Sequence, residues 1–269
     1  MRRLSEFPVK TLASIKYLLC DIDDTITTDG RLTPEAYAAM ARLQSAGLLV
    51  IPITGRPAGW CDHFARMWPI DAIVGENGAF YFRYNHDTRT FQKQFFADDK
   101  TRRINRTRLN EVADHILKAV PGSALASDQL YREADIAIDF CEDVKPLSSI
   151  DIERIVSLME EQGLTAKVSS IHVNGWIGSY DKLTMTKRLM AEVFKCEIEA
   201  EKELFVFVGD SPNDQPMFQF FPNAVGVANL HHFEKDLTHK PAYVTEREAG
   251  SGFVELADAL ISARAASTV

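Results

Sequence analysis

Several features that mark common classes of protein are scarce or missing in this chain of 269 residues. Its four cysteines are scattered, without Cys-x-x-Cys spacing or a nearby histidine pattern, so they predict free thiols in a reducing compartment rather than a zinc site or a disulfide framework. No apolar run approaches the roughly 20 residues that span a bilayer, and no apolar segment follows Arg2 and Arg3 as it does in a signal peptide. We therefore expect a cytoplasmic protein with no membrane partner.

An excess of positive charge is also missing. The formal net charge is −8, so the whole molecule should repel nucleic acid and anionic membranes. The basic run from Lys100 to Arg108 opens an amphipathic helix, where such a run is usually a solvated face. We expect no nucleic-acid partner, and an anionic substrate must be drawn in by a local cationic pocket.

The chain does contain enough apolar residues for a sizeable core, 46% of the total, and a regular alternation of elements. The sequence predicts a strand at 17–22, a helix from the N-cap Thr33 to Gly47, a strand at 48–53, a helix through 63–67 and a short strand at 72–74. This order predicts an α/β fold with a doubly wound parallel sheet, a Rossmann-like core whose ligands gather at the carboxyl ends of the strands.

After Gly78 the pattern changes to a hairpin at 79–95 and then to a unit with the order αββαββ. The elements of that unit are predicted at 104–120, near Tyr131, and at 136–140, 150–162, 166–169 and 172–177. The parallel pattern then resumes with a helix at 183–193 and a strand at 204–208. We therefore predict a core formed by residues 1–96 and 180–269, and an inserted α/β cap domain, residues 97–179, over the carboxyl ends of the strands.

Two of the predicted core strands end in clusters of acid. The strand at 17–22 runs into Asp21-Ile22-Asp23-Asp24-Thr25, and the strand at 204–208 runs into Gly209-Asp210-Ser211-Pro212-Asn213-Asp214. Unit charges about 4 Å apart repel by roughly 4 kcal/mol at an effective dielectric of about 20, so a fold that gathers such carboxylates normally holds a cation between them. Hard oxygen ligands around one ion favour Mg²⁺.

The residue types at these strand ends suit phosphoryl transfer. One carboxylate, Asp21, can attack a phosphoryl group while Asp23 exchanges a proton with the leaving oxygen. Acid-rich turns are also common as purely structural features, but a second acidic turn at the same edge favours a site. Thr54 and Arg56 can meet a phosphate or simply end a strand. Lys182 opposes the dipole of the helix that it opens, so it needs a phosphate or a salt-bridge partner.

Taken together, these residues resemble the motifs of the haloacid dehalogenase superfamily of phosphohydrolases. The similar segments are residues 21–25 for its first motif, Thr54-Gly55-Arg56 for the second, Lys182 for the third and residues 209–214 for the fourth. The αββαββ insertion is similar to the larger α/β cap of the subfamily that contains Cof-type sugar phosphatases and sucrose-phosphate phosphatase. The resemblance covers nearly the whole chain.

The resemblance implies a Mg²⁺-dependent phosphatase that hydrolyses a small phosphate monoester, such as a sugar phosphate, through an aspartyl-phosphate intermediate. Asp21 would be the nucleophile and Asp23 the acid and base, with Lys182 offsetting the charge of Asp21. The implied metal ligands are Asp21, Asp23, Asp210 and Asp214, and the implied substrate-binding residues are Thr54, Gly55, Arg56, Lys182, Asn213, Glu76 and Asn77.

Two alternatives stay open at this point. A phosphomutase similar to phosphomannomutase would share the core, and a non-catalytic binding or regulatory protein would lack Asp21 or Asp23, both of which are present. In the cap, His172, Asn174 and Trp176 alternate along one strand face and can point together at a substrate, although structural roles are commoner for such residues. The sequence leaves open whether the protein is a monomer or a homodimer.

Overall fold

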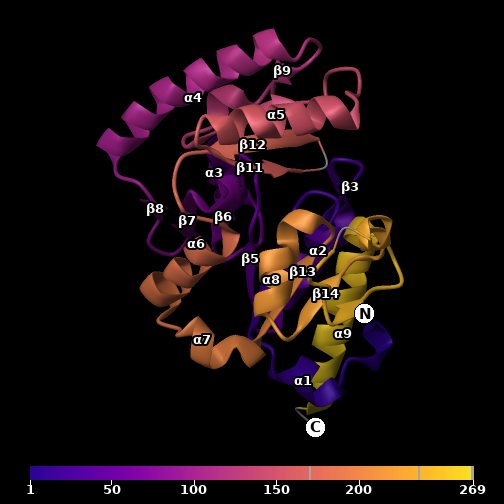
Figure 1. Cartoon of the computed structure of the whole chain (residues 1–269). Helices are drawn as coiled ribbons and strands as arrows, with labels where there is room; N and C mark the ends of the chain where they lie inside the picture. The colour runs from indigo at the N-terminus through magenta and orange to yellow at the C-terminus, as the bar shows by residue number, and fades with distance from the viewer. Residues whose placement is uncertain (170, 236, 268–269) are drawn as a thin grey trace.

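The structure is a computed structural model that describes residues 1–169, 171–235 and 237–267. Figure 1 shows a large sheet with helices on both sides and, above it, a smaller sheet beneath two helices. No helix in the described ranges has both the length and the apolar character needed to cross a membrane.

The large sheet is parallel throughout, as predicted. Its strand order is β1 (Arg2–Arg3), β15 (Tyr243–Val244), β14 (Ala224–Gly226), β13 (Phe205–Gly209), β2 (Tyr17–Cys20) and β5 (Leu49–Pro52). The neighbours β13 and β2 pair Val208 with Cys20, so they end at the same edge. The residues that follow these two strands therefore emerge side by side.

Alternate residues of each central strand face opposite layers of helices. Along β13, Val206 and Val208 join one buried apolar cluster, while Phe205 and Phe207 join another. Both clusters are buried, and a strand covered on both faces has a near-continuous apolar sequence, as β13 does. The first cluster includes residues of α1 (Val9–Ser14), α2 (Pro34–Ser45), α3 (Ala58–Met67) and α9 (Ala249–Ser267). The second cluster includes residues of α6 (Lys182–Leu189) and α8 (Gln215–Phe220). The short helix α7 (Ile198–Glu201) lies near the N-terminal end of β13.

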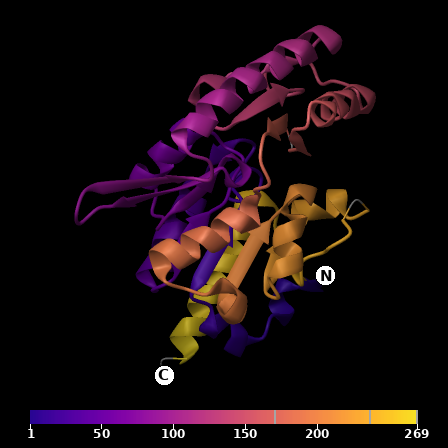
Figure 2. The same cartoon turned by 60° about the vertical axis from the view of Figure 1, so that its left-hand side comes forward.

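The strand predicted at 72–74 does not belong to the large parallel sheet. It is β6 (Ile73–Gly75), which pairs antiparallel with β7 (Phe80–Asn85) and β8 (Thr90–Phe95) in a three-stranded sheet. A single parallel bridge, Ile53 to Val74, links it to the end of β5. The predicted hairpin is present and extends away from the body of the molecule in Figure 2. Residues 27–32 form a second, shorter hairpin of β3 (Thr27–Thr28) and β4 (Arg31–Leu32).

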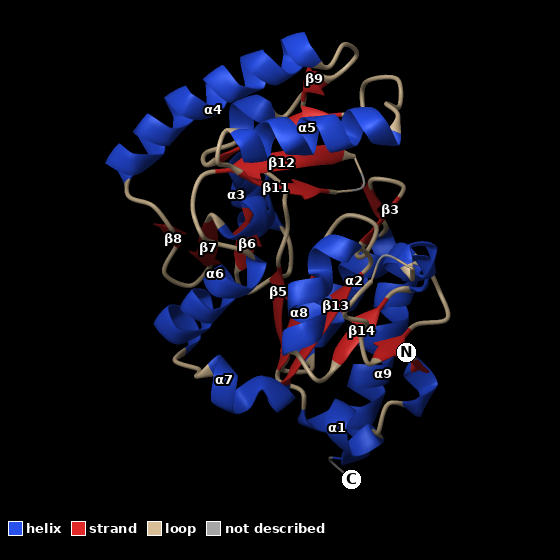
Figure 3. Cartoon of the chain, in the orientation of Figure 1, coloured by secondary structure: helices blue, strands red, loops and turns tan. Residues whose placement is uncertain are grey.

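The smaller sheet is antiparallel and has one apolar and one polar face. Its order is β11 (Thr165–Val168), β12 (His172–Trp176), β10 (Asp135–Asp139) and β9 (Ala124–Leu125). Ile136, Ile138 and Val173 pack under α4 (Asp99–Ala119) and α5 (Ser149–Glu161), which cover one face in Figure 3. The alternate residues, among them Asp135 and His172, lie on the other face, toward the large sheet.

Two local predictions need correction. Tyr131 lies in a short 3₁₀ turn, Gln129–Tyr131, rather than in a strand, and β9 precedes it. Helix α4 begins at Asp99, five residues before the predicted start, because the Asp98 side chain caps it by accepting a hydrogen bond from the Thr101 amide at 2.7 Å. All elements of the smaller sheet and its helices fall within residues 97–179, although the division into domains stays a prediction.

Candidate active site

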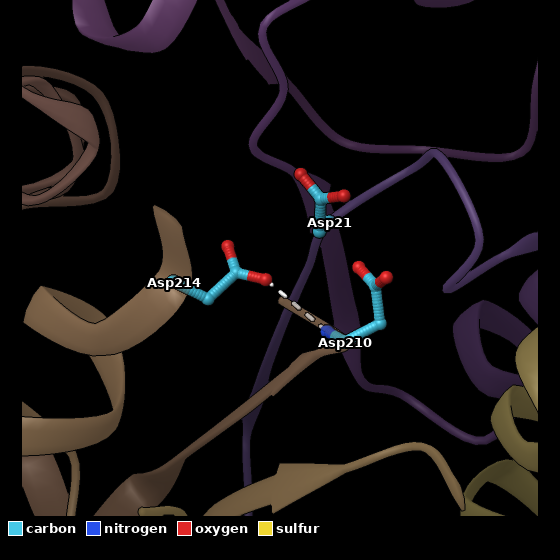
Figure 4. A group of neighbouring side chains, drawn as sticks. All are labelled: Asp21, Asp210 and Asp214. Atoms are coloured by element: carbon cyan, nitrogen blue, oxygen red, sulfur yellow. Dashed lines mark hydrogen bonds between the residues drawn. The ribbon is translucent and has the colours of Figure 1, made fainter. Parts of the chain in front are cut away.

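The two acidic strand ends meet at one point of the large sheet. Asp21 follows β2 and Asp210 follows β13, and the Asp21 amide donates to the Val208 carbonyl at 2.9 Å. Asp214 closes the short turn Pro212–Asp214. The three carboxyl groups are buried and offer oxygen atoms that all lie within 4.8 Å of one another (Figure 4). The predicted juxtaposition of the acids is therefore present.

Lys182 lies directly beside these acids. Its Nζ is 2.7 Å from Asp21 Oδ1 and 2.9 Å from Asp214 Oδ1, so it needs no surface partner. Lys182 is the first residue of α6 rather than a residue before it, and the Asp181 side chain caps that helix through the Thr184 amide. Burial disfavours the ammonium charge, but the two carboxylates outweigh burial and hold the pKa of Lys182 above its ordinary value.

Two close approaches of the backbone keep this arrangement in place. A Cβ at Gly209 would lie 2.3 Å from Asp214 Oδ2, so only glycine leaves room for that carboxylate. Gly78 has a positive φ of 109°, and a Cβ there would lie 2.1 Å from the Asp181 carbonyl oxygen, next to the start of α6. Asp214 Oδ2 also accepts a hydrogen bond from the Asp210 amide at 3.2 Å, which Figure 4 draws as a dashed line.

The cluster carries more negative charge than one lysine offsets. Burial raises the pKa of Asp21 to about 7, with Lys182 opposing the shift and Asp214 adding to it. Burial and then Asp21 raise the pKa of Asp210 well above its usual range. Among the described residues, the side-chain donors to the Asp210 carboxyl are neutral groups, Thr25 Oγ1 at 3.1 Å and Asn229 Nδ2 at 3.4 Å. A divalent cation would supply the missing charge, and the all-oxygen donor set fits Mg²⁺.

Arg56 lies beside the predicted acid and base rather than free for a phosphate. Its Nη2 is 2.7 Å from Asp23 Oδ1, and its Nε is 3.0 Å from both oxygens of that carboxyl. Asp128 and Glu142 approach the same guanidinium at 3.8 Å. Thr54 is buried, and its Oγ1 accepts a hydrogen bond from the Arg56 amide at 3.0 Å. This clamp fixes the Asp23 carboxyl at the mouth of the site.

Glu76 and Asn77, both implied by the family resemblance to bind the substrate, have different surroundings. The Glu76 carboxyl is fully buried and accepts three backbone hydrogen bonds, from the amides of Ala58 and Glu133 at 2.9 Å and of Ala134 at 2.6 Å. It therefore joins the core to the segment before β10 and does not face a substrate. Asn77 lies against Gly55, and both line the cavity described next.

A cavity of about 30 Å³ lies between the strand ends and the polar face of the smaller sheet. From the core it is lined by Asp21, Asp23, Gly55, Arg56, Asn77, Asp210, Ser211 and Asn213, and from the smaller sheet and its loops by Arg132, Lys167, Val168, Ser169, Ile171, His172 and Asn174. Four predicted site residues, Thr54, Glu76, Lys182 and Asp214, lie behind this surface instead.

Sequence reasoning missed Arg132, a buried cation in this cavity. Its guanidinium lies 3.1 Å from Asp128 Oδ1 and 3.0 Å from Asp135 Oδ2, and it donates to the Gly55 carbonyl at 3.1 Å. These acids hold the pKa of Arg132 above its ordinary value, even though burial acts in the opposite direction. The acids three and four residues away were the available signal, but their pairing depends on a turn that was predicted as a strand.

Of the three alternating residues in β12, two reach the cavity. His172 and Asn174 line it, and His172 Nε2 lies 2.8 Å from Glu142 Oε2. Burial, with a further contribution from Arg132, lowers the pKa of His172 to about 4. Trp176 instead packs into the core and donates its indole N–H to the Tyr180 carbonyl at 3.2 Å, so it has the structural role and does not stack on a substrate.

Comparisons with known proteins agree with this geometry. Residues 18–120 match the family of haloacid dehalogenase-like hydrolases. A phosphoglycolate phosphatase from Methanosarcina mazei is 26% identical over 256 residues, which cover 92% of this chain and 97% of that protein. Among solved structures, a Thermoplasma acidophilum protein has a TM-score of 0.70 at 19% identity, covering 91% of this chain and 98% of its own. The sucrose-phosphatase of Synechocystis sp. PCC6803, solved with sucrose and phosphate, has a TM-score of 0.62 at 16% identity, covering 91% and 97%.

The parallel sheet with acids at the ends of β2 and β13 agrees with these comparisons: residues 18–120 are similar to haloacid dehalogenase-like hydrolases, and the solved structures share the fold of this chain. The similarity to the curated phosphoglycolate phosphatases extends over nearly the full length of this chain.

Proposed function

We propose that the protein hydrolyses a small phosphate monoester in a Mg²⁺-dependent reaction with Asp21 as nucleophile. The observation that carries this proposal is the convergence of three buried carboxyl groups, with oxygens within 4.8 Å of one another, on a lysine Nζ 2.7 Å from Asp21. A structural role does not require such a concentration of buried charge, since it destabilises the fold unless a ligand offsets it.

The residues have complementary parts in this mechanism. The Asp21 carboxylate attacks phosphorus, the bond to the alcohol oxygen breaks, and that oxygen takes the proton from Asp23. Asp23 then removes a proton from water, which attacks the aspartyl-phosphate, and Asp21 and inorganic phosphate are released. Lys182 favours the anionic form of Asp21, which the first step requires, by opposing the effect of burial. Arg56 holds the Asp23 carboxyl in one orientation, at distances of 2.7 to 3.0 Å, for both proton transfers.

The metal site belongs to the same proposal. Asp21, Asp210 and the backbone carbonyl of Asp23 would hold Mg²⁺, while Asp214 anchors Lys182 and supports the Asp210 amide. When bound there, the ion supplies positive charge beside the phosphoryl oxygens. Asn213 and Gly55 line the cavity and would contact the substrate.

The relatives of this chain suggest which substrates to assay first. Two curated relatives, from Methanosarcina mazei and Methanosarcina acetivorans, are phosphoglycolate phosphatases. We therefore propose phosphoglycolate and small sugar phosphates as the first substrates to assay.

The decisive experiment measures release of inorganic phosphate from p-nitrophenyl phosphate and phosphoglycolate with Mg²⁺ and with EDTA. We expect activity that EDTA abolishes, and a loss of at least about a thousandfold in kcat in Asp21→Asn, because the amide cannot attack phosphorus. Asp87→Asn, an exposed acid in the β7–β8 turn, is the matched control and should keep full activity. Accumulation of phosphate also separates a phosphatase from a phosphomutase. Full activity of Asp21→Asn would overturn the proposed roles.

A further inference from the structure

The polar face of the smaller sheet presents a lysine to the cavity. Lys167 on β11 pairs in register with Asn174 on β12, and residues paired in this way project from the same face of an antiparallel sheet. Both side chains line the cavity that contains Asp21. Lys167 is exposed, so it is reachable by a ligand entering between the two sheets.

Lys167 differs from the other cations of the cavity in having no counter-charge. Arg56 is paired with Asp23 and Arg132 with Asp135, so the protein itself neutralises both guanidinium groups. In the part of the chain that the structure describes, Lys167 has neither an ion-pair partner nor a side-chain hydrogen bond. A substrate that fills the cavity displaces water from the ammonium group, and an anionic group on the substrate would compensate for that loss.

We infer that Lys167 binds a second anionic group of the substrate, a carboxylate, so that the substrate class is a small phosphorylated carboxylic acid. This inference rests on the proposed phosphatase function. The phosphoryl group lies at Asp21 and the strand ends, while Lys167 meets the opposite end of the molecule from the smaller sheet. Neutral hydroxyl groups of a sugar would offer the ammonium group of Lys167 no opposite charge.

A purely structural role could also explain the lysine at position 167, and experiment can distinguish it from substrate binding. β11 is the edge strand of its sheet, and lysine at an exposed edge discourages pairing with another chain. That role requires a charged side chain on the edge strand, but it does not require the side chain to lie at the cavity. It predicts that changing Lys167 affects association or solubility and leaves the choice between substrates unaltered.

The test compares 2-phosphoglycolate with 2-hydroxyethyl phosphate, in which a neutral hydroxymethyl group replaces the carboxylate. For each ester, kcat/KM is measured with Mg²⁺ in the full chain, in Lys167→Met and in Lys167→Arg. We expect Lys167→Met to lose about 10- to 100-fold on phosphoglycolate and less than about twofold on the neutral ester, with Lys167→Arg close to the parent on both. The control is Lys118→Met, an exposed lysine on α4, which covers the other face of the sheet.

Each other outcome is informative. Equal losses on both esters, or no loss on either, would overturn the carboxylate-binding role while the phosphatase function stands. The carboxylate-binding role would also be overturned if the parent enzyme showed no preference for phosphoglycolate over the neutral ester. Failure of the parent to hydrolyse p-nitrophenyl phosphate with Mg²⁺ would instead overturn the proposed function itself. Lys167→Gln serves as a second neutral variant, and circular dichroism spectra confirm that the variants are folded.

Discussion

At the scale of the residue, Asp210 shows most clearly how the site trades stability for function. Its carboxyl group is buried beside Asp21 and Asp214, and its hydrogen bonds come from the neutral groups of Thr25 and Asn229. Without a cation nearby, the charge of Asp210 is repelled by its neighbours and is not hydrated. A residue chosen for stability alone would be neutral at this position.

Replacing Asp210 by asparagine should therefore have opposite effects with and without Mg²⁺. Without the metal, Asp210→Asn should be more stable than the parent by about 1 kcal/mol, which raises Tm by about 2–4 °C, because a repulsive charge is removed. With Mg²⁺ at about 100 times its Kd, the parent should gain about 2.7 kcal/mol, while the variant should gain little. Thermal unfolding with Mg²⁺ and with EDTA measures both effects. An equal gain from Mg²⁺ in the two proteins would show that Asp210 is not a ligand.

At the scale of the element, the segment at 128–135 joins the smaller sheet to the core. Arg132 donates to the Gly55 carbonyl, and the amides of Glu133 and Ala134 donate to the Glu76 carboxyl. A Cβ at Gly59 would lie 2.9 Å from the Cβ of Tyr131, so α3 packs closely against the same segment. These contacts hold the polar face of the smaller sheet over the strand ends, which closes the cavity.

We expect Glu76→Gln to weaken this junction. Glutamine has nearly the same size as glutamate, but one of its two terminal groups is an N–H₂ donor. That group must face at least one of the backbone amides that now donate to the Glu76 carboxyl, so two buried donors would face each other. The free energy of unfolding should fall by about 2 kcal/mol, measured by urea denaturation. Glu161→Gln is the control, because its exposed carboxyl lies 3.6 Å from Arg154 and should contribute less than about 0.5 kcal/mol. Equal stability of the two variants would rule out Glu76 as a junction residue.

At the scale of the whole molecule, the order of elements and the acidic strand ends were predictable because both follow from local pattern. A buried strand such as β13 is an apolar run, and Asp210 directly after it must lie at the sheet edge. The pairing of Arg56 with Asp23 was not predictable, since it depends on how two loops 33 residues apart approach each other. The same holds for Glu76, whose partners Glu133 and Ala134 come from the inserted unit.

The residues of the inserted unit that reach the cavity were the least predictable. The alternation of side chains places His172, Asn174 and Trp176 on one face of β12. It does not predict which of these three residues border the cavity. The structure resolves the point: His172 and Asn174 meet the cavity, whereas Trp176 reaches past it into the core. Lys167 was hidden for a related reason, because its position relative to Asn174 follows from strand register.

Stability of the whole molecule should depend on His172 in weak acid. Its pKa is about 4 in the folded protein and about 6.5 in the unfolded chain, so the unfolded state binds more protons between these values. The free energy of unfolding should therefore decrease as the pH falls from about 6.5 to about 4, by up to about 3 kcal/mol from this residue. Glutamine at position 172 does not titrate, so the stability of His172→Gln relative to the parent should rise as the pH falls over the same interval.

Urea denaturation of the parent and of His172→Gln at several pH values measures that difference. Acids that do not contact His172 are common to both proteins and largely cancel in the comparison. His115→Gln, which changes an exposed histidine on α4, is the matched control for the substitution itself. If the difference between the parent and His172→Gln stayed constant with pH, the His172 ring would be as free to take up a proton as a solvated histidine. The two sheets would then be open to water around His172, and the closed cavity of this structure would not be the state that prevails in solution.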